Sequence, residues 1–144
     1  MSQELTESLE DYLEAISHLQ EEFKVARVKD ISSRLNVKMP SVTNALKVLK
    51  SKNMIDYEKN SFITLTQEGE KAAQRIIRKH EVCKDFFLNI LHLPEEEADR
   101  LACSVEHHIS GKTVSKWARL TELIEDFCKK NDDFARCMNQ LGTD

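Results

Sequence analysis

Cys103, Glu106 and His107 place a thiol, a carboxylate and an imidazole close together in the sequence. Residues 94–109 predict a helix, in which each residue turns by about 100°, so Glu106 and His107 lie about 60° and about 40° from Cys103. Side chains of these three types on one helix face can hold a divalent first-row metal ion. An ordinary hydrated helix surface is the alternative, because such spacing also arises by chance.

Asp11 and Glu14 form a second candidate for cation binding, because residues three apart share a face of a helix. The first 23 residues contain seven acidic side chains and no Lys or Arg. Like charges at this density repel one another, and a bound cation would relieve the repulsion. An ordinary hydrated acidic face is the alternative. His80 is a further candidate ligand, although a single His on a helix is more often structural.

The segment 24–60 carries nine basic and three acidic residues, in a chain whose net charge is −4. Such a chain could bind nucleic acid through this segment alone, and a hydrated charged surface is the alternative. Hydroxyl and amide side chains near the start of a helix at 40–50 can reach base edges, and the lysines around them can reach phosphates. Ser41 and Thr43 could instead satisfy N–H groups of the first turn. The candidate DNA-contacting residues are Lys38, Pro40, Ser41, Thr43, Asn44, Lys47, Lys50 and Lys59.

Apolar spacing and turn residues predict a mainly α protein with two domains, 1–70 and 71–144. The elements predicted for the first domain are, in order, a helix, a short helix, a turn, a helix that starts with Pro and a two-stranded hairpin. This is the order of a winged helix-turn-helix. The second domain is predicted to be helical. The predicted helices cover residues 6–22, 28–35, 40–50, 66–91, 94–109, 113–129 and 132–141, and the predicted strands cover 54–57 and 62–65.

The composition excludes several classes of protein. Only 3 Gly and 2 Pro occur in 144 residues, too few for the many turns of a β-sandwich or barrel. No apolar run approaches the roughly 20 residues that span a bilayer, and the acidic N-terminus has no signal-peptide pattern. We therefore expect a soluble, cytoplasmic protein without a membrane partner. The four cysteines form no CxxC pair, which argues against a zinc ribbon or a thioredoxin-like site.

The chain resembles the metal-dependent transcriptional repressors of the diphtheria toxin repressor family, and among them the short manganese transport regulators. The resemblance covers nearly the whole chain. It implies an N-terminal winged-helix domain with a two-stranded β wing, a C-terminal helical dimerisation domain, and metal-enabled binding of a homodimer to double-stranded operator DNA. The short motifs that carry it are residues 10–14, 26–28, 40–43, 65–69, 78–81 and 105–108.

The resemblance also implies a ligand set. Asp11 would join Cys103, Glu106 and His107 around one metal ion, and Glu14 and His80 match positions that bind a second ion in the manganese regulators.

Four positions qualify this ligand set. The manganese branch has Glu at the position of Cys103, and the iron branch has Met at the position of Asp11, so the site is a hybrid. Lys84 replaces a carboxylate of the iron branch, whereas Asp99, one turn before Cys103, could serve as a ligand. A thiolate favours softer ions than carboxylates do, so we expect Fe²⁺ or Mn²⁺ as the effector, with Zn²⁺ or Co²⁺ as further candidates. A metal-binding thiolate at Cys103 would also be open to oxidation.

Three functions compete at this point. The first is a metal-sensing repressor that controls iron or manganese homeostasis, and the second is a winged-helix regulator that does not respond to metal. The third is an enzyme with Cys103 as nucleophile and His107 as base. Both residues lie on one helix without a Gly-rich turn or an evident oxyanion donor nearby, so we do not expect an enzyme.

Overall fold

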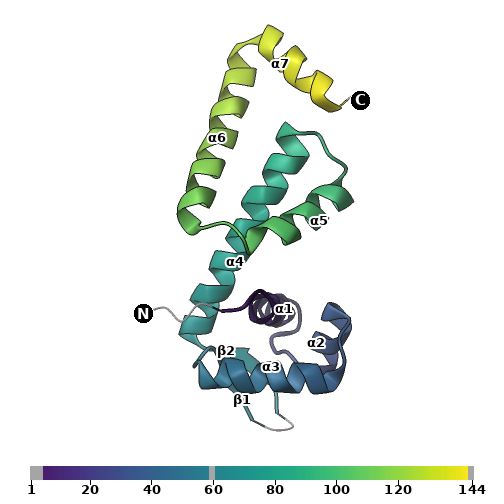
Figure 1. Cartoon of the computed structure of the whole chain (residues 1–144), viewed down its shortest axis with the longest axis vertical. Helices are drawn as coiled ribbons and strands as arrows, with labels where there is room; N and C mark the ends of the chain where they lie inside the picture. Colours follow the sequence, from purple (N-terminus) through teal and green to yellow (C-terminus); the bar gives the residue numbers. More distant parts are fainter. Residues whose placement is uncertain (1–4, 59–60, 143–144) are drawn as a thin grey trace. The chain divides into compact units, whose positions relative to one another are not determined.

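The computed structural model describes residues 5–58 and 61–142. The fold is mainly helical and divides into two compact units, residues 1–76 and 77–144 (Figure 1). The division of the chain into domains at residue 70 remains a prediction. Among the described residues, no helix combines the length and the apolar character that crossing a bilayer requires.

The first unit is a winged helix-turn-helix, as the sequence predicts. Its two strands pair antiparallel, with Ile55 opposite Leu65 and Tyr57 opposite Ile63. Ala26 extends this sheet through a bridge to Ile63, whose N–H lies 2.9 Å from the Ala26 carbonyl oxygen. The elements are α1 (Glu7–Phe23), α2 (Val28–Leu35), α3 (Met39–Ser51), β1 (Ile55–Tyr57), β2 (Ile63–Leu65) and the first part of α4 (Gln67–Asp85).

The core of this unit is built by one apolar face from each helix. Leu13 and Ile16 of α1, Ile31 of α2 and Leu46 of α3 have no exposed surface, and Ile63 of β2 closes the core from the sheet side. Apolar residues spaced three or four apart share one side of a helix, so burying that side leaves the polar side in water. The apolar face of α3 therefore points inward, and its polar face remains available for binding.

Local signals set the ends of these helices. Thr6 caps α1 by accepting a hydrogen bond from the backbone N–H of Leu9 at 3.4 Å. Asn36 ends α2 with a φ of 53°, a left-handed conformation that Asn tolerates better than most residues. Pro40 stands in the first turn of α3, where its missing N–H costs no hydrogen bond.

The second unit contains the end of α4 and the remaining helical elements. The predicted continuous helix 66–91 is wrong at its end, since Phe86–Ile90 forms a wider π-helical turn. The rings of Phe86 and Phe87 pack edge-on against Trp117, with centroids 5.3 and 6.0 Å away, and this packing accompanies the wider turn. The elements are η1 (Phe86–Ile90), α5 (Glu95–Glu106), α6 (Gly111–Lys130), α7 (Asp132–Asn139) and the 3-10 turn η2 (Gln140–Gly142).

The helix predicted over residues 94–109 ends three residues early. α5 stops at Glu106 and His107 is its C-cap residue. Ser110, the residue after this predicted range, caps the start of α6, where its hydroxyl accepts from the Thr113 N–H at 3.2 Å. His107 therefore lies at a helix end rather than inside a helix.

Replacing Gly69 should destabilise the first unit. A Cβ on Gly69 would overlap the backbone carbonyl oxygen of Met54, which cannot move without disturbing the start of β1. We expect Gly69→Ala to lower the free energy of unfolding by about 1–3 kcal/mol, the usual cost of overpacking. Gly111→Ala is the matched control, because a Cβ there meets nothing within 4 Å. Urea unfolding monitored by circular dichroism compares the variants, and equal stability of the two would contradict this account.

Candidate metal centre and nucleic-acid interface

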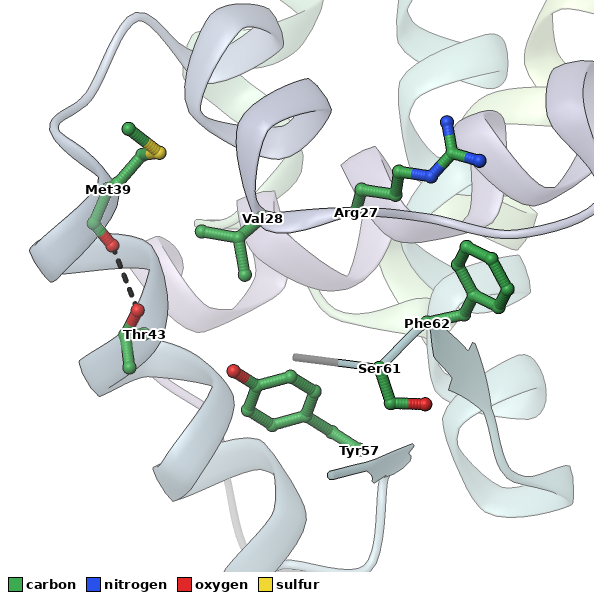
Figure 2. Close-up of a pocket in the computed structure, with 7 residues that line it drawn as sticks. All are labelled: Arg27, Val28, Met39, Thr43, Tyr57, Ser61 and Phe62. Atoms are coloured by element: carbon green, nitrogen blue, oxygen red, sulfur yellow. Dashed lines mark hydrogen bonds between the residues drawn. The ribbon is translucent and has the colours of Figure 1, made fainter. Parts of the chain in front are cut away.

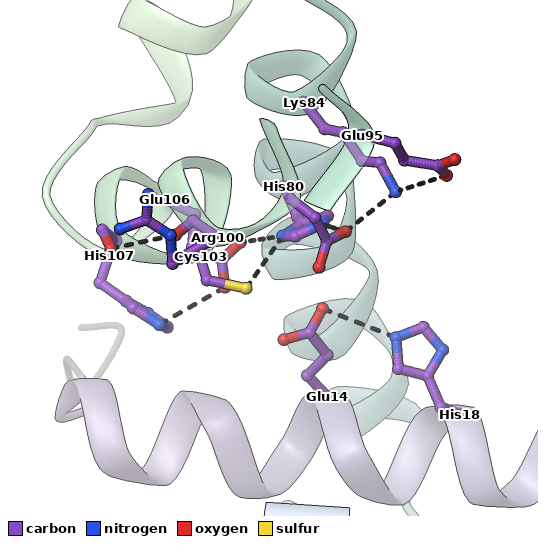
Figure 3. Close-up of polar contacts among 11 residues, drawn as sticks. Glu14, His18, His80, Lys84, Glu95, Arg100, Cys103, Glu106 and His107 are labelled. Atoms are coloured by element: carbon purple, nitrogen blue, oxygen red, sulfur yellow. Dashed lines mark hydrogen bonds and ion pairs between the residues drawn. The ribbon is translucent and has the colours of Figure 1, made fainter. Parts of the chain in front are cut away.

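Three donor side chains of the second unit come together, and His80 of α4 lies between the other two. Its Nδ1 atom lies 2.7 Å from Oε2 of Glu106 and 3.7 Å from Sγ of Cys103, both on α5 (Figure 3). One donor atom from each residue lies within 4.8 Å of the other two. The helices α4 and α5 thus bring an imidazole, a carboxylate and a thiol to one point.

Glu106 is the most buried member of this cluster, with 1% of its side chain exposed. Removing a carboxylate from water is costly unless opposite charge or hydrogen bonds compensate it. Glu106 has two imidazole neighbours, His80 at 2.7 Å from Oε2 and His107 at 3.4 Å from Oε1. Both carboxylate oxygens therefore face a nitrogen atom.

The other ring nitrogen of His80 faces an ion pair. Nε2 lies 3.2 Å from Oδ1 of Asp99, and the same oxygen lies 2.9 Å from Nζ of Lys84. The hydrogen bond from Lys84 holds the pKa of Asp99 below its usual value, and the same bond raises the pKa of Lys84. Asp99 is therefore an ionised acceptor on the Nε2 side of His80.

The cysteines of this unit differ in their chemistry. Cys83 has no exposed surface, and its burial, with a smaller contribution from the charge of Glu106, raises its pKa to about 11. Cys83 is therefore a protonated thiol at neutral pH. Cys103 is exposed and lies beside His80. Of these two residues, Cys103 is the one that can supply a thiolate ligand.

The structure brings some of the predicted ligands together. His80, Cys103 and Glu106 form one cluster, and His107 contacts Glu106. His80 is a separate candidate in the sequence, because nothing in its spacing links α4 to α5. The pairing of Lys84 with Asp99 was also missed, although Lys84 lies one helical turn after His80.

Asp11 and Glu14, the remaining predicted ligands, lie on α1 in the first unit. Glu14 Oε1 is 3.6 Å from Nε2 of His18, one turn further along the same helix (Figure 3). For both residues, the role of metal ligand remains a prediction from the sequence.

The predicted DNA-contacting residues lie on and around α3. Thr43 donates its hydroxyl to the Met39 carbonyl oxygen at 3.1 Å, and Lys50 donates to the Tyr57 carbonyl oxygen at 2.6 Å, which ties α3 to β1. Lys59 lies outside the described residues. The side chains exposed at the surface are Lys38, Pro40, Ser41, Asn44, Lys47 and Lys50.

A hollow separates the start of α3 from the strands (Figure 2). Arg27 lies at its edge, with its guanidinium carbon 5.2 Å from the centroid of the Phe62 ring. Arg27 enters the sequence prediction only through the family motif 26–28, and Phe62 only through the predicted strand 62–65. The hollow is lined by Arg27, Val28, Met39, Thr43, Tyr57, Ser61 and Phe62.

The donor set of the second unit suits a first-row divalent ion. Imidazole and carboxylate are ligands for Mn²⁺ and Fe²⁺, and a thiolate adds affinity for softer ions. The burial of Glu106 leaves a negative charge that a cation would balance, and Cys103 is exposed at the surface. The residues therefore fit a metal ion by charge, by ligand type and by proximity.

Two family models match the chain. One describes the N-terminal DNA-binding domain of iron-dependent repressors and matches residues 4–62. The other describes the metal-binding and dimerisation domain of the same repressors and matches residues 66–138. Together they account for most of the chain.

Individual relatives agree with these models. The HTH-type transcriptional regulator MntR of Bacillus velezensis is 36% identical over 121 residues, which make up 84% of each chain. MntR of Bacillus subtilis is 35% identical over 128 residues, covering 88% of this chain and 89% of that one.

Solved structures share the fold. The crystal structure of T. acidophilum IdeR has a TM-score of 0.70 and 30% identity, and the match covers 81% of this chain but only 54% of that longer one. A manganese-dependent transcriptional repressor in complex with manganese has a TM-score of 0.73 at 23% identity, over 79% of this chain and 52% of that one. Taken with the two family models, these likenesses show that the chain belongs to the iron-dependent repressor family of metal-dependent, DNA-binding transcriptional regulators.

Proposed function

We propose that this protein represses transcription when Fe²⁺ or Mn²⁺ is bound, and that His80, Cys103, Glu106 and His107 supply ligands from the second unit. The observation that carries the proposal is the approach of three chemically different donor atoms to within 4.8 Å of one another. A hydrated surface, the alternative for these residues, does not account for a carboxylate that is 1% exposed between two imidazoles.

Asp11 is the candidate ligand from the first unit. A divalent ion bound by both carboxylates would offset the repulsion between Asp11 and Glu106. Its charge would also offset part of the repulsion among the seven acids of the first 23 residues. Glu14, on the same face of α1 as Asp11, is the candidate ligand for a second ion.

Metal binding would act on DNA binding as a coupling between two sites. Ligands that come from both units favour one arrangement of the DNA-binding unit on the dimer. Such coupling is typically 1–3 kcal/mol, or about 5- to 150-fold in affinity, and it is reciprocal. Operator DNA should therefore tighten metal binding by the same factor.

The types of ligand are compatible with either Fe²⁺ or Mn²⁺ as the effector. Carboxylates and imidazoles suit Mn²⁺, whereas Cys103 shifts the preference toward Fe²⁺, Co²⁺ or Zn²⁺. Zn²⁺ has the higher intrinsic affinity, so selection of Fe²⁺ or Mn²⁺ would depend on site geometry and on metal availability. Titrations with each ion under anaerobic conditions separate these effectors.

The exposed face of α3 is the candidate DNA reader. Ser41 and Asn44 are exposed near its start, where side chains reach base edges in helix-turn-helix proteins. Lys38, Lys47 and Lys50 surround them and are candidates for phosphate contacts. The charge of residues 24–60, nine bases against three acids, supports this assignment.

An exposed apolar face on α6 supports a homodimer. Leu120, Leu123 and Phe127 are each half exposed and lie on the side of α6 opposite its buried residues Val114 and Thr121. A second copy of the chain is the partner that a dimerisation domain implies. Two reading helices in such a dimer would bind half-sites about 34 Å apart.

Glu106→Gln should abolish the metal response while leaving the fold intact. The amide has nearly the shape of the carboxylate but is a weaker ligand, so operator binding should no longer tighten with metal. A DNA fragment selected by the wild-type protein from a random pool in the presence of Mn²⁺ provides the operator. Fluorescence anisotropy with and without Mn²⁺ or Fe²⁺ measures the affinity.

His108→Ala is the control for this experiment. His108 is exposed and follows the end of α5, and we expect it to leave the metal response nearly unchanged. Full metal response in Glu106→Gln would contradict the ligand assignment. Equal operator binding by wild-type protein in Mn²⁺ and in chelator would favour the regulator that does not respond to metal.

Substitutions on α3 should separate affinity from sequence preference. Lys47→Ala removes a candidate phosphate contact, so the affinity for every DNA sequence should fall. The slope of log affinity against log salt concentration should also become shallower, by about one for each phosphate that is no longer bound. Asn44→Ala should instead change which sequence is preferred. Binding to the selected fragment and to single-base variants at several salt concentrations measures both effects. An altered base preference in Lys47→Ala with unchanged salt dependence would refute the assignment.

Charge on the apolar face of α6 should split the dimer. Leu123→Lys places an ammonium group among Leu120 and Phe127, and burying it against a second copy would be costly. We expect light scattering at micromolar concentration to give a dimer mass for wild type and a lower mass for Leu123→Lys. Ser115→Lys, at an exposed polar position of the same helix, should remain dimeric. A monomeric wild-type protein in the presence of metal would rule the dimer out.

A further inference from the structure

We propose that Asp99 and Lys84 are positioning residues that make Nδ1, rather than Nε2, the metal-binding atom of His80. This inference rests on the proposed metal site. The carrying observation is that the two ring nitrogens have different surroundings. Nδ1 faces Glu106 at 2.7 Å and Cys103 at 3.7 Å (Figure 3). Nε2 instead faces Asp99 at 3.2 Å.

A neutral imidazole has one N–H and one lone pair. The nitrogen that donates a hydrogen bond fixes the tautomer and leaves the other nitrogen to bind the metal. Glu106 faces Nδ1 and Asp99 faces Nε2, so each ring nitrogen has a carboxylate acceptor in the absence of metal. A metal ion bound by Glu106 would take the place of the proton on Nδ1, whereas Asp99, which is not a ligand, would hold the proton on Nε2. The lone pair of Nδ1 would then point toward the ion that the carboxylate and the thiol also bind.

Lys84 keeps Asp99 in this role. Its ammonium lies 2.9 Å from the Asp99 oxygen that contacts His80 and 3.5 Å from Oε1 of Glu95. An ionised carboxylate has only acceptor oxygens, and the contact with Lys84 keeps this oxygen of Asp99 beside Nε2. The ammonium therefore supplies, from within the chain, the positive charge on the Nε2 side of the ring.

This arrangement also limits where a second ion can bind. Asp99 and Glu95 would otherwise offer two carboxylates beside Nε2 of His80. The ammonium of Lys84 contacts both of them and would repel a divalent cation. We therefore assign Asp99 to orientation of His80 rather than to ligation, in contrast to the ligand role that its position in the sequence suggested.

Nuclear magnetic resonance can identify the binding nitrogen directly. The full-length protein is labelled with ¹⁵N-histidine and loaded with ¹¹³Cd²⁺, and scalar coupling between cadmium and nitrogen is measured. We expect the His80 coupling to appear at Nδ1, with the proton on Nε2. Coupling at Nε2 would overturn the inference while leaving the metal site in place. Absence of cadmium coupling to any histidine would overturn the metal site as well.

Variants test the role of each positioning residue. Asp99→Leu removes the acceptor, and we expect Cd²⁺ affinity to fall by about 10- to 100-fold, with coupling no longer confined to Nδ1. Asp99→Asn keeps an acceptor oxygen and should retain coupling at Nδ1. Lys84→Met should cause a smaller decrease in affinity, and Lys84→Arg should restore it.

Arg100→Leu is the matched control, because Arg100 neighbours Asp99 on α5 and its side chain is 72% exposed. It should change neither the affinity nor the coupled nitrogen. Wild-type affinity together with coupling only at Nδ1 in Asp99→Leu would overturn the inference. Circular dichroism of each variant separates these effects from loss of folding.

Discussion

The second unit depends on the burial of one carboxylate. Glu106 is the last residue of α5, so its charge lies at the negative end of the helix dipole and away from water. Either circumstance would be unfavourable alone. The imidazoles of His80 and His107 compensate by facing its two oxygens, which joins α4 to the end of α5. The same charge contributes to the raised pKa of Cys83, so its influence extends to the interior of the unit.

Most of the first unit could be predicted from the sequence, because its signals are local. The predicted second helix has the observed bounds, Val28–Leu35, and the third differs by only one residue at each end. Periodicity, a first-turn proline and left-handed Asn36 decide these elements within a few residues. The π-helical turn at Phe86–Ile90 could not be predicted, since it accompanies the packing of two rings against Trp117, which is 30 residues away.

The candidate site shows the same division between local and long-range information. Helical rotation alone predicts Cys103, Glu106 and His107 on one face. In the structure Glu106 lies near each of the other two, but the helix ends at Glu106. Spacing within α5 cannot reveal that His80 on α4 lies beside Glu106. Nor can it reveal that Lys84 forms an ion pair with Asp99. Those contacts depend on how the two helices pack. The sequence and the family resemblance both supply His80 as a candidate ligand, but neither supplies the orientation of its ring.

The distribution of aromatic residues gives the two units different optical properties. The chain has one tryptophan, Trp117, which lies in the second unit. Its two tyrosines, Tyr12 and Tyr57, both lie in the first unit. Trp117 packs edge-on against Phe86 and Phe87, and its indole nitrogen is buried without a hydrogen-bond partner among the described residues. Its emission should therefore be that of an indole in an apolar environment. Ultraviolet light of a wavelength that excites tryptophan but not tyrosine would then give fluorescence from the second unit alone. Unfolding of the second unit could therefore be followed without an added label, and the first unit would not contribute to the signal.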